Sequence, residues 1–261
     1  MANAIQLNKK IFFVVTGASR GIGQALAIEN GSKMLPGSVV VLLARNGQDL
    51  ESTKEQILLR NPELQVDTYS VDLSNPSVDD ITTKLQTSLG KSDQNFELAY
   101  IIHNVGSIGD ITKKAKDLNN IELWRQYYDL NVFSIATLNS VFMSMFSATK
   151  KFVVNITSKC GVAPFESFAL YCSGKAAREM FFKVLAVEEK NVLVLNYSPG
   201  PVDTDMTIDA QANSCSPDVQ NMFKGLRDAK TILTPVQTTK RFLEIVEKGD
   251  YNSGDHVDFY D

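Results

Sequence analysis

Residues 11–23 read IFFVVTGASRGIG, a largely apolar, β-branched run that is followed directly by a glycine-rich segment. A continuous apolar run of this kind is typical of a strand that is buried on both faces of a parallel sheet. Glycines allow the chain to turn sharply, and the next residues, QALAIEN, have a helical pattern. The stretch therefore predicts a strand, a tight turn and a helix.

The glycines of this turn indicate a phosphate-binding site. They would let the main chain approach a phosphate, which the free N–H groups and positive dipole end of the following helix would bind. A plain strand-to-helix turn would explain one glycine but not three. The spacing G-x-x-x-G-x-G differs from the general G-x-G-x-x-G fingerprint, so that rule gives partial support to a dinucleotide cofactor. The expected contacts in the loop are Gly17, Ser19, Arg20, Gly21, Ile22 and Gly23.

The end of the second predicted strand, 38–43, bears on the choice of cofactor. A ribose 2′-hydroxyl usually meets an acidic residue at this point, whereas a 2′-phosphate meets an arginine. The chain has Ala44 and Arg45 here, and Arg20 supplies a second cation. The position predicts NADPH rather than NADH, although an arginine at a strand end is commonly just solvated.

Strand and helix patterns alternate along the whole chain. The predicted strands are 11–16, 38–43, 65–70, 97–102, 151–157, 192–197 and 254–259, and helices are expected at 49–60, 77–89, 119–147, from about 169 to 189 and at 235–248. This alternation predicts one α/β domain over 1–261, a doubly wound parallel sheet of the Rossmann type with helices on both faces. Residues 203–234 are polar without a clear period, and we interpret this long insertion as an irregular functional loop, a substrate lid.

Composition excludes several classes of function. The net charge of −4 argues against a nucleic-acid or anionic-membrane surface. The three cysteines, Cys160, Cys172 and Cys215, are too few for a disulfide framework or a zinc site, and with only two histidines we expect no metal. No apolar run approaches the length of a membrane span. These features predict a cytoplasmic protein.

A second informative stretch, residues 155–175, reads NITSKCGVAPFESFALYCSGK. Ser158 follows a predicted strand, and Tyr171 and Lys175 would share one face of a helix. A nearby ammonium group favours the phenolate, so the pKa of Tyr171 would be lowered from about 10 and its hydroxyl could donate a proton. Ser158 could hold a substrate oxygen beside the phenol. Taken alone, Tyr-x-x-x-Lys is common, and two amphipathic surface residues are the alternative.

Three further polar residues follow strands or interrupt a helix. Asp72 could accept a hydrogen bond from an adenine amine or cap the next helix, which is the commoner role. Asn104 lies in a Gly-containing strand end where a cofactor could pass close to the backbone. Asn131 falls within the predicted helix 119–147, so it is either a structural hydrogen-bonding residue or part of a proton relay.

Together these motifs resemble the short-chain dehydrogenase/reductases over nearly the whole chain. The matching segments are Thr16–Gly23, Asn104-Val105-Gly106, Asn131, Ser158, Tyr171-x-x-x-Lys175 and Pro199-Gly200-Pro201-Val202-x-Thr204. They occur in the family's order and at its spacing. His103-Asn104-Val105-Gly106 departs from the usual Asn-Asn-Ala-Gly of the family.

The resemblance implies roles for these residues in an NADPH-dependent reductase. Tyr171 would be the proton donor, and Lys175 would bind the nicotinamide ribose and lower the tyrosine pKa. Ser158 would position the carbonyl, and Asn131 would hold a water in a relay. The further cofactor contacts implied are Ala44, Arg45, Asp72, Asn104, Lys175, Val202 and Thr204. The resemblance also implies a homodimer.

Other segments resemble the members of the family that reduce side-chain carbonyls of pterins in the last steps of tetrahydrobiopterin formation. They include 43–46, 106–110, 169–178, 195–201, 203–206 and the terminal 256–261. The substrate contacts implied are Ser158, Tyr171, Gly200 and Asp258. Asp258 would accept paired N–H bonds from the guanidine-like edge of the pterin.

Two other functions stay open at this point. One is a broad carbonyl reductase of the same family that acts on diketones, quinones or steroids. Such apolar ketones have no use for a buried carboxylate, so Asp258 distinguishes this function from pterin reduction. The other is a non-catalytic NADP(H)-binding regulator, against which the intact Ser158, Tyr171 and Lys175 argue.

Overall fold

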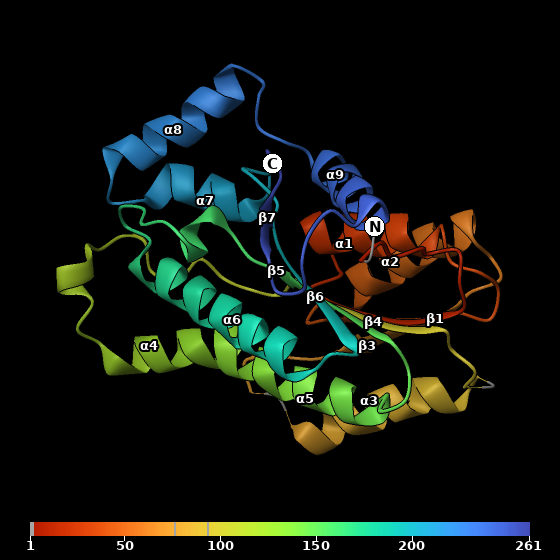
Figure 1. The fold of residues 1–261 in the computed structure, drawn as a ribbon. Helices are drawn as coiled ribbons and strands as arrows, with labels where there is room; N and C mark the ends of the chain where they lie inside the picture. Colours follow the sequence, from red (N-terminus) through yellow and green to blue (C-terminus); the bar gives the residue numbers. More distant parts are fainter. Residues whose placement is uncertain (1–2, 76, 93) are drawn as a thin grey trace.

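The computed structural model describes residues 3–75, 77–92 and 94–261. At its centre lies a parallel sheet with strand order β3-β2-β1-β4-β5-β6-β7 (Figure 1). The strands are β1 (Ile11–Thr16), β2 (Val39–Ala44), β3 (Gln65–Ser70), β4 (Leu98–His103), β5 (Lys151–Ile156), β6 (Val192–Ser198) and β7 (His256–Asp258). Every residue of β1, β2, β4, β5 and β6 is buried, as expected for apolar runs that are covered on both faces.

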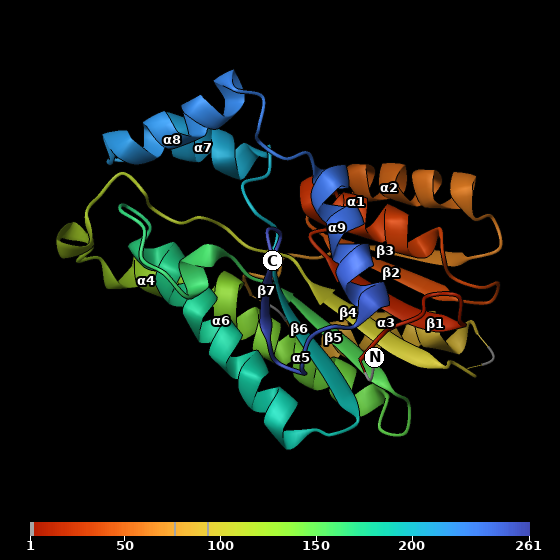
Figure 2. The same ribbon diagram turned by 45° about the horizontal axis from the view of Figure 1, so that its top comes forward.

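Helices connect the strands and cover both faces of the sheet, as Figures 1 and 2 show. They are α1 (Gly21–Gly31), α2 (Gly47–Arg60), α3 (Val78–Gly90), α4 (Ile121–Tyr128), α5 (Ser134–Met145), α6 (Ala169–Glu188), α7 (Asp205–Asn213), α8 (Pro217–Asp228) and α9 (Pro235–Lys248). Short 3-10 helices are η1 (Ala115–Asp117) and η3 (Lys159–Gly161). Within the described ranges, none of the helices has the length and apolar character needed to cross a membrane.

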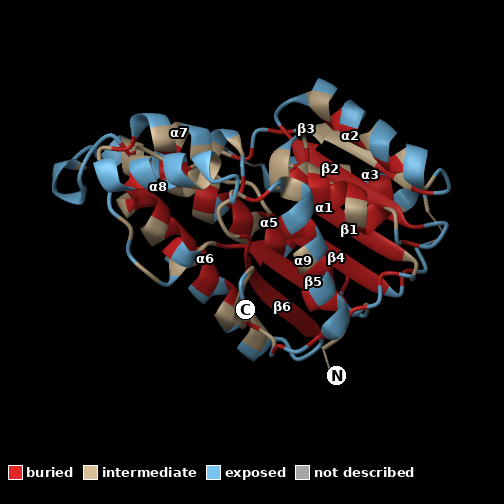
Figure 3. Ribbon diagram, turned by 90° about the horizontal axis from the view of Figure 1, so that it is seen from above, coloured by how far each residue is buried: buried red, intermediate tan, exposed pale blue. Residues whose placement is uncertain are grey.

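Successive residues of β1 divide the core between the two faces. Phe13 and Val15 belong to the apolar cluster that includes residues of α1, α2 and α9. Phe12 and Val14 belong to the cluster that includes residues of α3, α5 and α6. Figure 3 shows the buried strands between helices whose outer faces are exposed. The predicted doubly wound parallel sheet is therefore confirmed.

The long helix predicted over 119–147 is interrupted. Between α4 and α5 lies a π-helical segment, Asp129–Phe133, which contains the buried Asn131. The Asn131 Nδ2 donates to the main-chain oxygen of Tyr127 at 2.8 Å, one turn earlier. Wide turns of this kind occur mostly as single insertions within α-helices and often lie at functional sites. The apolar residues keep a helical spacing through this segment, so the sequence did not predict the π-helical turn.

The prediction of an irregular loop over 203–234 is wrong, because α7 and α8 occupy most of it. The Thr204 N–H donates to the Thr207 Oγ1 at the start of α7. Ser216 caps α8, and Pro217 is its first residue. These are ordinary signals for the start of a helix, whereas the prediction rested on polar composition alone. The last predicted strand, 254–259, is also shorter in the structure, where it comprises His256–Asp258.

His103, where the family usually has asparagine, is fully buried at the end of β4. Its Nε2 lies 3.3 Å from the Asn139 Oδ1, and its Nδ1 has no partner in the described part of the chain. Burial, assisted by the charge of Arg178, lowers the pKa of His103 to about 3. The imidazole is therefore neutral in the folded protein at every pH near neutrality.

This burial predicts a loss of stability in mild acid. In the unfolded chain a histidine takes up a proton below a pKa of about 6.5, while the folded chain does not, so the free energy of unfolding should fall as the pH drops from 6.5 toward 3. The loss should approach roughly 1.4 kcal/mol per pH unit. His103→Asn should remove this component, whatever its effect at pH 7. Urea unfolding of both proteins at pH 7, 6 and 5 measures the free energy of unfolding. An equal change of this free energy with pH in the two proteins would contradict the prediction.

Candidate active site

The turn after β1 has the geometry of an anion site. Gly17 and Gly21 adopt φ of +66° and +59°, the left-handed region that glycine tolerates. A Cβ placed on Gly21 would meet only the Thr204 Cγ2, at 3.6 Å, so the main chain is open there. The Arg20 side chain makes no hydrogen bond that caps the start of α1. The free N–H groups and the open backbone fit a phosphate group of a dinucleotide.

Asn104 holds this turn in place. Its Nδ2 donates to the main-chain oxygens of Thr16 and Gly17, at 3.1 and 3.3 Å, and its N–H donates to the Thr16 Oγ1 at 2.9 Å. Asn104 therefore ties the end of β4 to the end of β1. The structure places it beside the glycine loop, with its side-chain Nδ2 occupied by these main-chain bonds.

The expected adenosine end of the site lies at the ends of β2 and β3. Ala44 is buried at the end of β2, and Arg45 is exposed beside it. The Asp72 Oδ1 accepts a hydrogen bond from the Ser74 N–H at 2.9 Å, whereas Ser77 caps α3. The reading of Asp72 as the cap of the next helix is therefore wrong. Hydrogen bonds from Ser74, and more weakly the charge of Arg45, lower the pKa of Asp72.

Arg20, the second predicted cation, forms an exposed ion pair with Asp205 at the start of α7. The glycine loop is thus linked to the insertion that follows β6. The pair is solvated on both sides, so it contributes little to stability. A cofactor phosphate would compete with Asp205 for this guanidinium.

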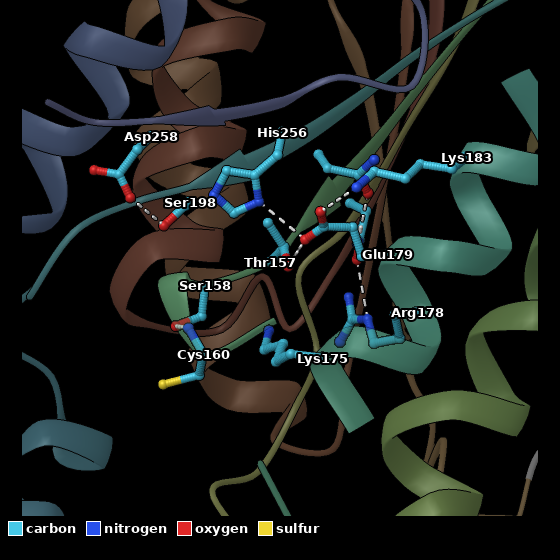
Figure 4. Close-up of polar contacts among 12 residues, drawn as sticks. Thr157, Ser158, Cys160, Lys175, Arg178, Glu179, Lys183, Ser198, His256 and Asp258 are labelled. Carbon is cyan, nitrogen blue, oxygen red and sulfur yellow. Dashed lines mark hydrogen bonds and ion pairs between the residues drawn. The ribbon is translucent and has the colours of Figure 1, made fainter. Parts of the chain in front are cut away.

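Three of the four predicted catalytic side chains come together where β5 meets α6. Ser158 follows β5, and its Oγ accepts a hydrogen bond from the Cys160 N–H at 3.2 Å. α6 begins at Ala169, so Tyr171 and Lys175 do share a helix face, and both side chains are buried. The Lys175 Nζ lies 5.4 Å from the Tyr171 ring centre and donates to the Ile156 oxygen at 2.7 Å. Figure 4 shows Ser158 and Lys175 facing the same region.

The pKa of Tyr171 differs from the expectation. Burial raises it well above the ordinary value of a tyrosine, and a hydrogen bond with Ser158 and the charge of Arg178 oppose this rise only in part. The prediction of a lowered tyrosine pKa is therefore wrong for this structure. Burial also lowers the pKa of Lys175 itself. The phenol is consequently protonated at neutral pH, which is the state that a proton donor requires.

Asn131 connects the π-helical segment to the loop after β4. Its Oδ1 accepts a hydrogen bond from the Ser107 N–H at 2.8 Å, in addition to the Nδ2 bond to Tyr127. The amide is 2% exposed. The structure gives this residue a direct structural role, and a bond to a relay water would use its remaining donor and acceptor capacity.

The loop after β6 passes close to the glycine turn. Gly200 has φ of +73°, and a Cβ there would lie 2.9 Å from the Leu233 Cδ1. Val202 is buried and forms an isolated parallel bridge with Leu233. Thr204 lies against Gly21 across the predicted cofactor site. The expected contact Thr204 thus lies beside the glycine loop, and Val202 precedes it by two residues.

Asp258 lies at the end of β7, two strands from β5 in the sheet. The register pairs Ile156 with Tyr197 and Tyr197 with Val257, so Ser158 and Asp258 extend from the same edge. The Asp258 Oδ2 accepts a hydrogen bond from the Ser198 Oγ at 2.6 Å, which fixes the carboxylate (Figure 4). It is half-buried rather than a freely solvated C-terminal charge.

Two buried charged residues of α6 were not predicted. The Arg178 guanidinium donates to the Asn155 Oδ1 and to the main-chain oxygens of Val105 and His103, at 2.8 to 3.0 Å. Burial lowers its pKa to about 10, so it stays charged. Glu179 contacts Thr157, Lys183 and His256. The only signal for them in the sequence was their spacing from Lys175, because residues one helical turn apart lie on the same face of a helix.

This fold and site define a class of protein. The model of the short chain dehydrogenase family matches residues 12–214. The chain belongs to this family, and it is an oxidoreductase that uses a nicotinamide cofactor.

Within the family the chain is similar to the sepiapterin reductases. The rat enzyme is 36% identical over 251 residues, which make up 95% of this chain and 95% of that protein. Among solved structures, a short-chain dehydrogenase/reductase from Saccharomyces cerevisiae has a TM-score of 0.81 and 26% identity, over 97% of this chain and 96% of that one. A short chain dehydrogenase from Shigella flexneri complexed with NADP has a TM-score of 0.78 and 21% identity, over 98% and 99%.

The buried phenol gives a direct test of the site. Tyr171→Phe should bind the reduced nicotinamide cofactor normally and lose turnover by about 100-fold or more, because a positioned proton donor contributes on that scale. Cofactor fluorescence and steady-state rates measure the two effects. Tyr127→Phe removes the hydroxyl of a neighbouring buried tyrosine and should keep most of the activity. Wild-type turnover by Tyr171→Phe would refute the assignment.

Proposed function

We propose that this protein reduces the side-chain carbonyl of a pterin with NADPH, as sepiapterin and 6-pyruvoyl-tetrahydropterin are reduced in the final steps of tetrahydrobiopterin formation. The observation that carries the proposal is the fixed Asp258 carboxylate, two strands from Ser158 at the same edge of the sheet. Two strand spacings amount to roughly 10 Å, comparable with a bicyclic ring and its side chain. The similarity to sepiapterin reductases over 95% of the chain supports the same substrate class.

Each residue of the site would then have a separate role. Asp258 would accept hydrogen bonds from the guanidine-like edge of the ring, and Ser158 would hold the carbonyl oxygen beside the phenol. Tyr171 would transfer its hydroxyl proton to that oxygen. NADPH, when bound, supplies the hydride. Lys175 would bind its nicotinamide ribose, while the glycine turn would bind its phosphates.

NADPH rather than NADH is supported by charge at the end of β2. Arg45 is exposed there, and no acidic residue follows β2 directly. Arg20 supplies a second cation in the glycine loop, where it pairs with Asp205. The structural neighbour from Shigella flexneri was solved with NADP, which is consistent with this choice for a protein of the same fold.

We also propose that α7 and α8 form a lid over the substrate, within one domain that spans 1–261. Residues of both helices pack in a small apolar cluster that includes Tyr171 and Phe168. The cluster would cover the reacting carbonyl and exclude water from it. We propose a cytoplasmic location as well, which the three free cysteines favour.

The experiment that tests the function is the loss of NADPH absorbance when sepiapterin is added, with diacetyl and NADH in parallel. Rapid oxidation of NADPH with sepiapterin, and little oxidation of NADH, would support the proposal. Turnover of diacetyl alone would replace it with a general carbonyl reductase. A lack of turnover with every substrate would favour a non-catalytic regulator.

Asp258→Ala should raise the KM for sepiapterin by about ten-fold or more and change the KM for diacetyl little, because only the pterin has an edge for the carboxylate. Asp250→Ala removes an exposed acid that pairs with Lys248 and is the matched control. Steady-state kinetics with both substrates give the result. An equal change for both substrates would exclude the anchoring role.

We propose that the protein is a homodimer that pairs through α5 and α6. Met180, Val184 and Val187 are exposed along one face of α6. Beside them a hollow of about 320 Å³ lies between the two helices. A charge at the centre of such a face should disrupt pairing, so Val187→Asp should elute as a monomer in size-exclusion chromatography with light scattering. Leu59→Asp on α2 is the control, and monomeric wild-type protein would refute the proposal.

A further inference from the structure

The buried carboxylate of Glu179 joins three elements of the site. Its Oε2 accepts a hydrogen bond from the Thr157 Oγ1 at 3.0 Å and lies 2.9 Å from the His256 Nδ1. Its Oε1 lies 2.8 Å from the Lys183 Nζ. The side chain is only 3% exposed. Figure 4 shows these groups converging on the carboxylate from β5, β7 and α6.

Each of these contacts is adjacent to a group that we place in the active site. Thr157 directly precedes Ser158, and His256 is two residues before Asp258. Glu179 is one helical turn after Lys175. One carboxylate oxygen therefore contacts both the strand end that carries the carbonyl-binding serine and the strand that carries the proposed ring anchor.

β7 depends on such side-chain contacts because it is short and lies at the edge of the sheet. It comprises three residues, His256–Asp258, and pairs with β6 alone. The bond from His256 to Glu179 reaches past β6 to α6. It therefore fixes β7 relative to the helix that also carries Tyr171.

The junction is charged and closely packed. Burial would raise the pKa of Glu179, but the interactions with His256, Lys183 and Thr157 outweigh it and leave the pKa lowered, so the carboxylate is ionised. A Cβ on Gly161 would lie 3.0 Å from both the Glu179 Oε2 and the Thr157 Oγ1. The turn that follows Ser158 therefore packs directly on the junction.

We propose that Glu179 is a positioning residue that, through Thr157 and His256, sets the separation of Ser158 from Asp258 and thereby the preference for substrates long enough to reach both. The inference rests on the proposed function, in which Asp258 binds the far edge of the substrate. A small ketone contacts only the Ser158 end. Its reduction is therefore insensitive to where β7 lies.

The test uses pairs of variants that remove or retain one contact. Thr157→Val removes the hydroxyl and Thr157→Ser keeps it, while His256→Ala removes the ring and His256→Asn keeps a donor near the Nδ1 position. Lys183→Met is the control, since it removes the half-exposed partner and leaves both positioning contacts.

The removing variants should lower kcat/KM for sepiapterin by about ten-fold or more, mainly through KM, because small displacements of substrate contacts have large effects on rate. With diacetyl the change should stay within about three-fold. The retaining variants and Lys183→Met should resemble the wild type with both substrates. Equal losses with both substrates, or a lower melting temperature with unchanged selectivity, would overturn the inference.

Crystal structures of the wild type and His256→Ala provide a readout that needs no pterin turnover. The separation of the Ser158 Oγ from the Asp258 carboxylate should change in the variant, and an unchanged separation would overturn the inference. If the wild type reduces diacetyl but not sepiapterin, the proposed function fails. The structural comparison then still decides whether Glu179 positions these two groups.

Discussion

The parallel hydrogen-bond ladder of the sheet is the constraint on which the site depends. Because all strands run in the same direction, the carboxyl ends of β1, β4, β5, β6 and β7 meet at a single edge. Thr16, Asn104, Ser158 and Asp258 are each the last residue of a strand or lie within two residues of its end. The register therefore brings together groups that are up to 242 positions apart, since 258 − 16 = 242. A slip of one residue in any pairing would turn its side chains to the other face.

Buried charges then fix α6 against this edge. The Arg178 guanidinium binds carbonyl groups at the end of β4 and the side chain of Asn155 in β5. Glu179 binds the end of β5 and β7. A buried charge that loses its partners is strongly unfavourable, so the helix cannot slide or rotate without breaking these contacts. Tyr171 and Lys175, on the preceding turns, take their position from this arrangement.

Much of the fold could be read from the sequence because its strands are continuous apolar runs. β1 and β3 have the predicted limits, β5 and β6 differ from theirs by one residue at one end, and β2 and β4 are shifted by one residue at both ends. Apolar pattern does not report hydrogen bonding within a helix, so the π-helical turn at Asn131 was missed. Polar composition likewise concealed α7 and α8, whose start signals at Thr204 and Ser216 were present.

The site was predicted as a set of residues but not as an arrangement. Ser158, Tyr171 and Lys175 converge as their motif implies, whereas Arg178 and Glu179 read as ordinary charges of an amphipathic helix. Their partners lie on other strands, and only the strand order shows that Thr157 and His256 are near each other. The helix spacing of Tyr171 and Lys175 also said nothing of burial, which decides the direction of the tyrosine pKa.

Burial keeps the Tyr171 phenol protonated at neutral pH, because it raises the pKa of this side chain. Desolvation disfavours the phenolate, and the Lys175 Nζ that would favour it donates to the Ile156 oxygen. Ser158 and Arg178 oppose this effect without reversing its direction. Carbonyl reduction consumes a proton at the oxygen, so a phenol that is fully protonated at neutral pH is suited to that direction. The reverse reaction needs the phenolate as a base, and the same burial makes the phenolate scarce.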